Sequence, residues 1–305
     1  MRAVFVDADK ALAAITEKLR RAGDPPVAIN RNPDVKPDEL PVVLGDAEIA
    51  VIDHTRLPTP VAAKCRGLKH VVFLGTGARS YMDPEELEGF GITVHIIKGY
   101  GDTAVAECAI ALMWVAARGV ARMDRGMRAG QWLGIEGVQL TGKRLGLLGF
   151  GGIAAEVARI ALGSGMKVVA WNRSRRTYAG VEFASLEQVL AQSDVISLHL
   201  LLTDETKGLL SRERIAAMKP GVILVNTARG GLVDEEAMIE ALRSGHIRHA
   251  GLDVFAIEPL PAGHIMTTLE NVTLSAHSAF RTPEASDNLI GAALDHCRRI
   301  AATGH

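Results

Sequence analysis

Three side chains of complementary chemistry follow apolar segments in the second half of the chain: Arg229, Glu258 and His277. Arginine has a planar charged fork that binds a carboxylate through two parallel hydrogen bonds. Histidine can give or take a proton near neutral pH, and a nearby carboxylate such as Glu258 favours its charged form. Together the three could hold an organic acid, polarise its carbonyl group and protonate the carbonyl oxygen.

Each of the three also has an ordinary structural explanation. The arginine could form an ion pair on the surface, the histidine could be hydrogen-bonded to its neighbours at a strand end, and the glutamate could be a solvent-exposed charge in a loop. Their positions favour chemistry, because each follows a segment that we predict to be a buried strand. These segments are Val222–Asn226, Ala250–Val254 and Asn271–Ser275. Ligands of open α/β sheets bind beyond the carboxyl ends of the strands.

A glycine-rich turn, Gly149-Phe150-Gly151-Gly152-Ile153-Ala154, matches the pattern G-x-G-x-x-G/A. It follows an apolar strand and opens a helical segment. The first glycine permits a tight turn, the second lets the backbone approach a pyrophosphate, and the helix N-terminus offers N–H groups to that anion. A plain glycine turn is the alternative. The context, a βαβ unit of roughly 30 residues, favours a dinucleotide site.

The residues after the next strand predict which dinucleotide binds. About 20 residues beyond the glycines, a site that prefers NAD places Asp or Glu, which binds the adenosine ribose hydroxyls. Here the strand Lys167–Trp171 is followed by Asn172, Arg173, Ser174 and Arg175. Asparagine does not repel a 2′-phosphate, and arginines can donate charge-assisted bonds of about 1.5–3 kcal/mol each to it. We predict that NADP is preferred, with NAD as the alternative cofactor; an ordinary solvated basic turn is the other explanation.

The elements that must position these residues alternate between short apolar strands and helical patterns, which is typical of parallel α/β sheets. A chain of 305 residues is long enough for two domains. We predict an α/β protein with two Rossmann-like or flavodoxin-like domains, each a doubly wound parallel sheet, and a cleft between them. Residues 100–280 form the dinucleotide-binding domain, and residues 1–99 with 281–305 form the substrate-binding domain.

Composition limits the partners. The formal net charge is -1, so no overall field attracts the protein to nucleic acid or to an anionic membrane. No apolar run approaches the roughly 20 residues that span a bilayer, and no Cys spacing typical of a metal site is present. We therefore expect a small-molecule ligand, no metal and a cytoplasmic location.

In these residues and motifs the chain resembles the D-isomer-specific 2-hydroxyacid dehydrogenases, which include glyoxylate/hydroxypyruvate reductases, D-lactate dehydrogenases and phosphoglycerate dehydrogenases. The likeness extends from about Gly67 to Ala285. The segments that carry it are Val105–Glu107, Leu140–Ile153, Asp194–His199, Asn226–Glu235, Gly251–Phe255 with Glu258-Pro259, and Ser275–His277.

The resemblance implies a role for each matching residue. Arg229 would hold the substrate, and Glu258 would tune His277 as the acid/base. Asp253 would fix the nicotinamide carboxamide, and the ring would be lined by Thr227 and Ala228. A loop of the first domain would meet the substrate carboxylate through its backbone amides; it consists of Gly75, Thr76 and Gly77. The family also implies a homodimer built mainly through the nucleotide domain.

Some positions depart from the family pattern. Leu201 and Ala276 stand where the family usually has proline, and both changes affect loop geometry rather than chemistry. Arg79 and Tyr81 are unusual in the first-domain loop, so they bear on substrate identity. By resemblance to NADP-linked reductases, we expect reduction of a small 2-oxo acid such as glyoxylate or hydroxypyruvate to the D-2-hydroxy acid.

Two other functions use the same residues. The scaffold can serve as a dinucleotide-sensing corepressor that binds peptide motifs, although nothing in the sequence favours this. Phosphite or another inorganic anion could also act as the hydride donor, because the same arginine, glutamate and histidine would serve that reaction.

Overall fold

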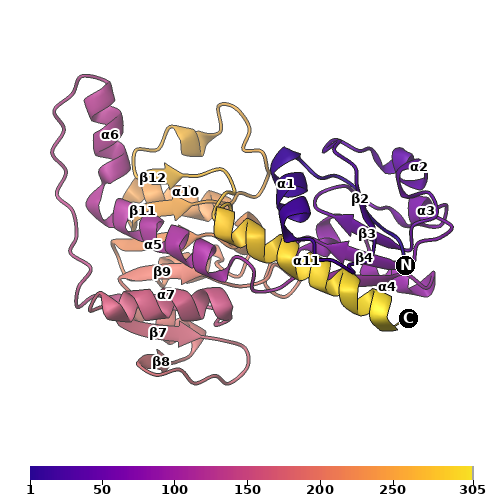
Figure 1. Cartoon of the computed structure of the whole chain (residues 1–305). Coiled ribbons are helices and arrows are strands. Elements are labelled where there is room, and N and C mark those ends of the chain that lie inside the picture. The colour runs from indigo at the N-terminus through magenta and orange to yellow at the C-terminus, as the bar shows by residue number, and fades with distance from the viewer. Residues whose placement is uncertain (304–305) are drawn as a thin grey trace. The chain divides into compact units, whose positions relative to one another are not determined.

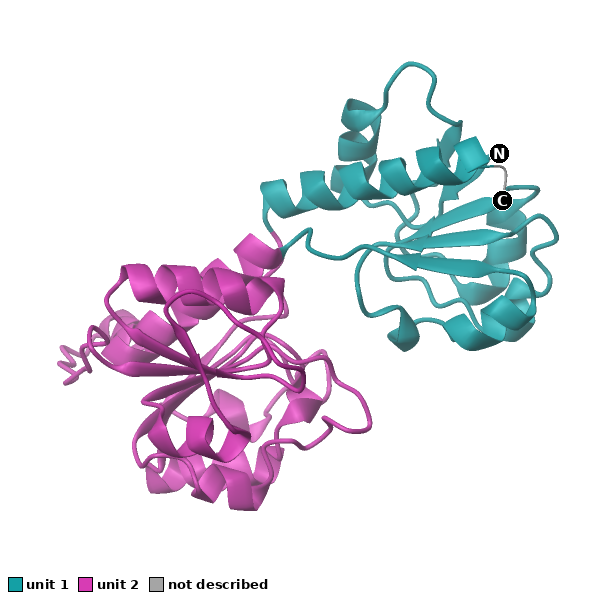
Figure 2. Cartoon of the chain, turned by 90° about the horizontal axis from the view of Figure 1, so that it is seen from below, with its two compact units in different colours: residues 1–101, 282–305 teal, residues 102–281 magenta. Residues whose placement is uncertain are grey.

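The computed structural model describes residues 1–303, which form two compact units (Figure 2). Unit 1 combines residues 1–101 with the chain from residue 282 onward, and unit 2 comprises residues 102–281. Each unit is built around a parallel β-sheet, and apolar helices cover both faces of it. The α/β class with two parallel sheets that the sequence predicted is therefore confirmed.

The sheet of unit 1 has five parallel strands in the order β2-β1-β3-β4-β5, which is the flavodoxin-like order. The central strands are fully buried, as expected for a sheet covered on both faces. The strands are β1 (Ala3–Phe5), β2 (Val27–Ile29), β3 (Ile49–Ile52), β4 (His70–Phe73) and β5 (Thr93–Ile96).

The helices of unit 1 lie in two layers. Apolar side chains of α1 (Lys10–Leu19) and α11 (Pro283–Thr303) form one core cluster with Phe5, and those of the shorter helices form the other. The shorter elements are η1 (Pro37–Glu39), α2 (Leu40–Leu44), α3 (Thr59–Ala62), η2 (Ala78–Ser80) and α4 (Pro84–Gly89). The last helix of the chain thus packs against the first strands (Figure 1).

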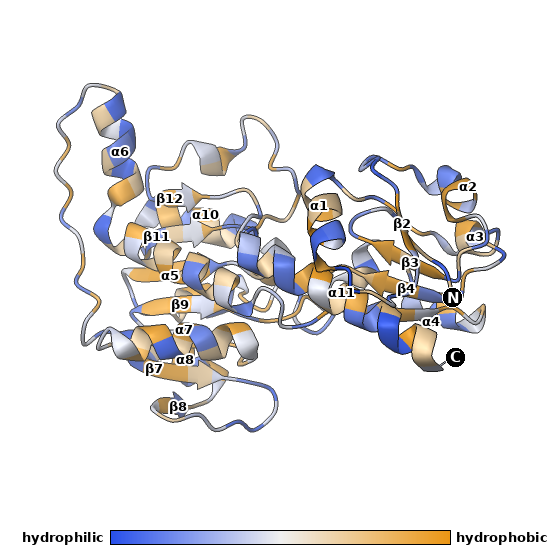
Figure 3. Cartoon of the chain, viewed as in Figure 1, coloured by the Kyte–Doolittle hydropathy of each residue, from blue (hydrophilic) through white to orange (hydrophobic). Residues whose placement is uncertain are grey.

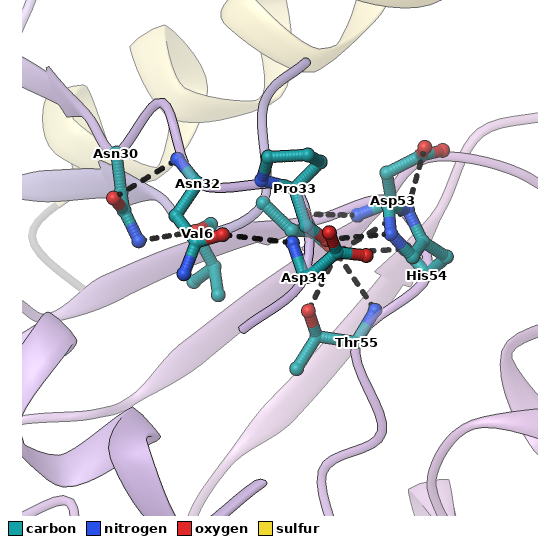
Figure 4. A network of polar contacts seen from close by, with 9 residues as sticks. Val6, Asn30, Asn32, Pro33, Asp34, Asp53, His54 and Thr55 are labelled. Carbon is teal, nitrogen blue, oxygen red and sulfur yellow. Dashed lines mark hydrogen bonds and ion pairs between the residues drawn. The ribbon is translucent and has the colours of Figure 1, made fainter. Parts of the chain in front are cut away.

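A buried carboxylate joins the ends of β1 and β3 in unit 1. Asp7 is fully buried, and it accepts hydrogen bonds from the backbone N–H groups of Asp53, His54 and Thr55 at 2.7–2.9 Å. The neighbouring His54 ring contacts Asp53 through Nδ1 (3.0 Å) and the carbonyl oxygen of Pro33 through Nε2 (2.7 Å). Figure 4 shows this network, which ties three separate loops together.

The sheet of unit 2 has seven parallel strands in the order β12-β11-β10-β9-β6-β7-β8. The chain order reverses at β6, so the crevice beyond the carboxyl ends of β6 and β9 is the expected ligand position in a sheet of this kind. The strands are β6 (Arg144–Leu148), β7 (Lys167–Trp171), β8 (Val181–Phe183), β9 (Val195–Leu198), β10 (Val222–Asn226), β11 (Ile247–Leu252) and β12 (Val272–Leu274).

Two groups of helices cover this sheet. The first group, α5 (Asp102–Arg118) and α7 (Gly152–Gly163), packs on one face, and the other face is covered by α8 (Leu186–Gln192), α9 (Arg212–Ala216) and α10 (Glu235–Ser244). The remaining elements are α6 (Val120–Arg128), η3 (Gly230–Leu232) and η4 (Ile265–Thr267). Apolar residues concentrate in the central strands, as Figure 3 shows.

Two helices in unit 2 start at residue types that favour a helix N-terminus. Ser185 and Gln188 form a reciprocal capping box at the start of α8, and the Asp234 side chain accepts from the N–H group of Ala237 at the start of α10.

Among residues 1–303, no single helix has the length and hydropathy expected of a membrane span. Helices α5 and α6 reach these values only when they are taken together, and the pair is bent by 67°.

Candidate active site

The three residues with complementary chemistry follow three neighbouring strands. Arg229 follows β10, Glu258 lies in the loop after β11, and His277 follows β12. Since β12, β11 and β10 are adjacent and parallel, their carboxyl ends lie at one edge of the sheet. The structure therefore brings these three segments to the same edge.

The turn that carries Arg229 is shaped by the last residue of β10. Asn226 is buried; its Oδ1 accepts from the N–H group of Ala228 at 3.0 Å, and its Nδ2 donates to the carbonyl oxygen of Arg229 at 2.9 Å. Arg229 is half-buried and donates to the carbonyl oxygen of Ala228. Within residues 1–303 its guanidinium has no carboxylate partner, so its charge is available to an anionic ligand.

His277 and Glu258 form a hydrogen-bonded pair. Nδ1 of His277 lies 2.7 Å from Oε2 of Glu258, and Oε1 of Glu258 accepts from the N–H group of Phe255 at 2.8 Å. The carboxylate thus fixes the ring orientation and favours the tautomer with its proton on Nδ1. In the described chain, Nε2 has no hydrogen-bond partner. This nitrogen is free to exchange a proton with a ligand.

The backbone at His277 is held in an unusual conformation. Its φ angle is 47°, in the left-handed region that non-glycine residues rarely adopt. The N–H group of His277 donates to the carbonyl oxygen of Asp253 at 2.8 Å. Such conformations cost about 1–3 kcal/mol, persist where surrounding contacts impose them, and cluster at functional sites.

Asp253 supplies those surrounding contacts. Its carboxylate is fully buried and accepts from the hydroxyl of Ser275 and from the N–H groups of Ser278 and Ala279, at 2.6–3.0 Å. The hydrogen bonds indicate that Asp253 holds the segment on which His277 stands. The role taken from the resemblance, contact with a nicotinamide carboxamide, stays a prediction.

The glycine-rich turn follows β6 and opens α7. Gly149 has a φ of 92°, and a Cβ there would lie 2.5 Å from the carbonyl oxygen of His199, so this position requires glycine. At Gly151, the N-cap of α7, nothing lies within 4 Å of an added Cβ, and no side chain caps the helix. Open space and uncapped N–H groups, with Gly152 and Ile153 in the first turn, fit a pyrophosphate.

Asn172 connects this glycine turn to the basic turn after β7. Its Oδ1 accepts from the N–H group of Phe150 at 3.0 Å, and its Nδ2 donates to both oxygens of Ser174 at 2.9 and 3.0 Å. Arg173 forms an exposed ion pair with Glu205 at 2.8 Å. Arg175 is exposed and has no carboxylate partner within residues 1–303, so it remains free to meet an anion.

A buried hydroxyl at the end of β10 also fits a bound ligand. Thr227 is 8% exposed, and among residues 1–303 its Oγ1 has no hydrogen-bond partner. Buried polar groups without a partner are rare in proteins, and a bound group can satisfy them. Thr227 and Ala228 directly follow β10, and one strand, β9, separates β10 from β6, which leads into the glycine turn. No cluster in the described chain has the ligands for a metal ion.

The predicted substrate loop belongs to unit 1. Gly75 has a φ of 152°, and its carbonyl oxygen accepts from the N–H group of Ile97 at 3.0 Å. Thr76 follows it, and Gly77 precedes the 3-10 helix η2. These contacts fix the loop within its own unit; its meeting with Arg229 stays a prediction.

Two polar residues of the site were given no role from the sequence. The sequence predicts Asn226 only as the end of a strand, although asparagine after an apolar run is a turn signal. Asp102 lies against Gly152 at the start of α7, 50 positions away in the chain. No local pattern signals such a contact, because it depends on how α5 packs against α7.

Comparison with known proteins agrees with this geometry. Residues 110–279 match the model of the D-isomer specific 2-hydroxyacid dehydrogenase family, NAD binding domain. The chain is 39% identical over 255 residues to the hydroxypyruvate reductase of Thermotoga maritima, covering 81% of this chain and 83% of that protein. It is 40% identical over 230 residues to the glyoxylate reductase of Aeropyrum pernix, with 68% and 69% covered.

A solved structure is similar over the whole chain. The TT0316 protein from Thermus thermophilus has a TM-score of 0.87 and 34% identity, covering 100% of this chain and 98% of that one. The fold and the residues at the sheet edge define a nicotinamide-dinucleotide-dependent oxidoreductase. The chain belongs to the D-isomer specific 2-hydroxyacid dehydrogenase family.

Proposed function

We propose that this enzyme reduces a small 2-oxo acid of the glyoxylate or hydroxypyruvate type to the D-2-hydroxy acid, with NADPH as the preferred hydride donor. The observation that carries the proposal is the 2.7 Å contact between Glu258 and His277, which leaves Nε2 of the histidine free at the sheet edge that also carries Arg229. The names of the Thermotoga and Aeropyrum relatives support acids of this size.

The proposed mechanism assigns one task to each side chain. Arg229 binds the carboxylate of the substrate and polarises its 2-oxo group. When bound, the reduced nicotinamide supplies a hydride to C2. As the C=O electron pair moves to oxygen, this oxygen takes the proton from Nε2 of His277, which ends the step as neutral imidazole. Glu258 stabilises the imidazolium before the transfer and keeps the ring aligned.

The cofactor preference is proposed from the turn after β7. An aspartate at position 172 would repel a 2′-phosphate, whereas Asn172 uses its amide to organise the glycine turn and Ser174. Arg175 offers a charge that has no carboxylate partner among residues 1–303. Arg173 can exchange its exposed ion pair with Glu205 for a phosphate at little cost, since such pairs contribute about 0–1 kcal/mol.

The enzyme is also proposed to be a homodimer that associates through unit 2. Helix α6 and the segment after it expose large apolar side chains: Val120 is 46% exposed, Met127 52% and Trp132 91%. Apolar groups that gather on one surface are typical of association sites. Light scattering of the purified protein should give twice the mass of one chain. Trp132→Glu places a charge on this apolar surface and should lower the measured mass toward that of the monomer.

The proposed reaction is tested by the absorbance of the reduced nicotinamide. NADPH or NADH is mixed in parallel with glyoxylate, hydroxypyruvate, pyruvate and phenylpyruvate. We expect oxidation to be fastest with NADPH and either glyoxylate or hydroxypyruvate. Tight cofactor binding with no oxidation across the panel would contradict the proposal and favour a sensor or an inorganic hydride donor such as phosphite.

A further inference from the structure

The carboxylate of Asp102 lies against the first residue of α7. A Cβ added to Gly152 would be 1.8 Å from Oδ2 of Asp102 and 2.8 Å from its Cγ. Any side chain at position 152 would therefore displace the carboxylate, and glycine is what permits this close approach. Asp102 occupies the space beside the N-terminal turn of α7.

That turn is the part of the glycine motif that offers N–H groups to the pyrophosphate. No side chain caps α7, whose N-cap residue is Gly151. Free N–H groups and the positive end of the helix dipole make such a terminus attractive to an anion. The Asp102 carboxylate is an anion that lies against the first residue of the same turn.

Neighbouring side chains do not neutralise the charge of Asp102. It is half-buried, and within residues 1–303 its carboxylate has no hydrogen-bond or ion-pair partner. Burial, followed by the negative charge of Glu156 on α7, raises the pKa of Asp102 above its ordinary value. The nearby charge is thus of the same sign, and Glu156 has its own arginine partner, Arg159.

We propose that Asp102 competes with the cofactor diphosphate for the N-terminus of α7, so that it weakens dinucleotide binding and accelerates cofactor release. This inference rests on the proposed dinucleotide site. A diphosphate bound at this helix terminus brings negative charge close to Oδ2, so binding must move the carboxylate away or keep two like charges close together. Removing the charge should therefore favour the bound state.

A purely structural role makes a different prediction. Asp102 is the first residue of α5, where a carboxylate also stabilises the helix through its interaction with the helix dipole. If this were its only role, neutral variants would lower the melting temperature and leave the dissociation constant of the dinucleotide unchanged.

The experiment compares the dissociation constants of NADPH, NADP⁺, NADH and NAD⁺ in the unmodified enzyme and in Asp102→Asn, by fluorescence titration. The release rate is measured in stopped flow. We expect the variant to bind all four roughly three- to tenfold more tightly, through slower release. Glu187→Gln is the matched control: it neutralises an exposed acid in the first turn of α8, on the opposite face of the sheet, and should change neither quantity.

A second variant separates charge from hydrogen bonding. Asp102→Ala removes the charge without adding an amide, and it should also tighten binding. Tightening in the asparagine variant alone would come from a new amide hydrogen bond and would overturn the proposal, as would an unchanged or larger dissociation constant in both. An unmodified protein that bound no dinucleotide would instead overturn the proposed function on which this inference depends.

Discussion

The backbone of Gly230 packs directly against the backbone of Phe255. A Cβ added to Gly230 would lie 2.0 Å from the carbonyl carbon of Phe255 and 2.3 Å from the nitrogen of Ala256. The segment that begins with Arg229 is therefore pressed against the loop that leads to Glu258. The spacing of these two functional residues depends on the absence of a side chain at position 230.

Gly230→Ala should consequently damage the active site and the fold together. The added methyl group meets backbone atoms, which cannot move aside cheaply, and overpacking of this kind costs about 1–3 kcal/mol or more. We expect a lower melting temperature and a loss of at least about tenfold in kcat/KM. Gly163→Ala, at the end of α7 with nothing within 4 Å of the new Cβ, is the control and should lower neither quantity. Full activity in Gly230→Ala would contradict the close contact.

Arg229→Lys tests the carboxylate anchor. Lysine keeps the charge but loses the planar fork, so one of two parallel hydrogen bonds to the substrate is lost. A charge-assisted bond contributes about 1.5–3 kcal/mol, so KM for the 2-oxo acid should rise roughly ten- to hundredfold. Arg212→Lys, in an exposed pair with Glu240, should leave KM unaltered. Unaltered kinetics in Arg229→Lys would remove Arg229 from the site.

Asn172→Asp tests the cofactor preference. The aspartate can still accept from the N–H group of Phe150, but its charge would repel a 2′-phosphate and suit ribose hydroxyls. The ratio of kcat/KM for NADPH to that for NADH should fall about tenfold or more. Arg175→Ala should lower the NADPH value alone. If neither variant changes this ratio, the basic turn is exposed to solvent and does not contact the 2′-phosphate.

The His54 cluster of unit 1 predicts a pH dependence of stability. Hydrogen bonding to Asp53, with the added charge of Asp7, raises the pKa of His54 to about 9, against an opposing effect of burial. A raised pKa in the folded state means that this stabilisation is complete below the unfolded value of about 6.5 and is lost as the pH rises through about 9. The melting temperatures of the unmodified enzyme and of His54→Gln should therefore approach each other as the pH rises from 7 to 10. A constant difference over that range would contradict a charged His54.

Much of the fold follows from local sequence signals. The long apolar strands of both units and the caps at Ser185 and Asp234 correspond to signals of periodicity and residue type in the sequence. Two strands, β2 and β8, lack such a signal. Each has only three residues, lies at an edge of its sheet and is partly exposed; β2 is Val-Ala-Ile and β8 is Val-Glu-Phe, so the pattern of each is too short to indicate a strand. Their pairing with a neighbour, rather than their composition, makes them strands.

The candidate site was predictable where it depends on strand ends and glycines. Parallel strands bring their carboxyl ends together, so the positions of Arg229, Glu258 and His277 indicated one edge. The hydrogen bonds that support them were not predictable. The three contacts of Asp253 with residues 275–279 and the approach of Asp102 to Gly152 join segments whose meeting is set by tertiary packing.

His277 is the proton donor of the proposed mechanism, and His277→Gln tests this role directly. Single-turnover hydride transfer is measured with NADPH and the best 2-oxo acid, and the NADPH dissociation constant is measured on the same protein. We predict a rate lowered by about 10²–10⁴-fold with cofactor affinity nearly unchanged, because the hydrogen bonds of the glycine turn do not involve this ring. An unchanged rate, or equal losses of rate and cofactor affinity, would contradict the assignment of His277.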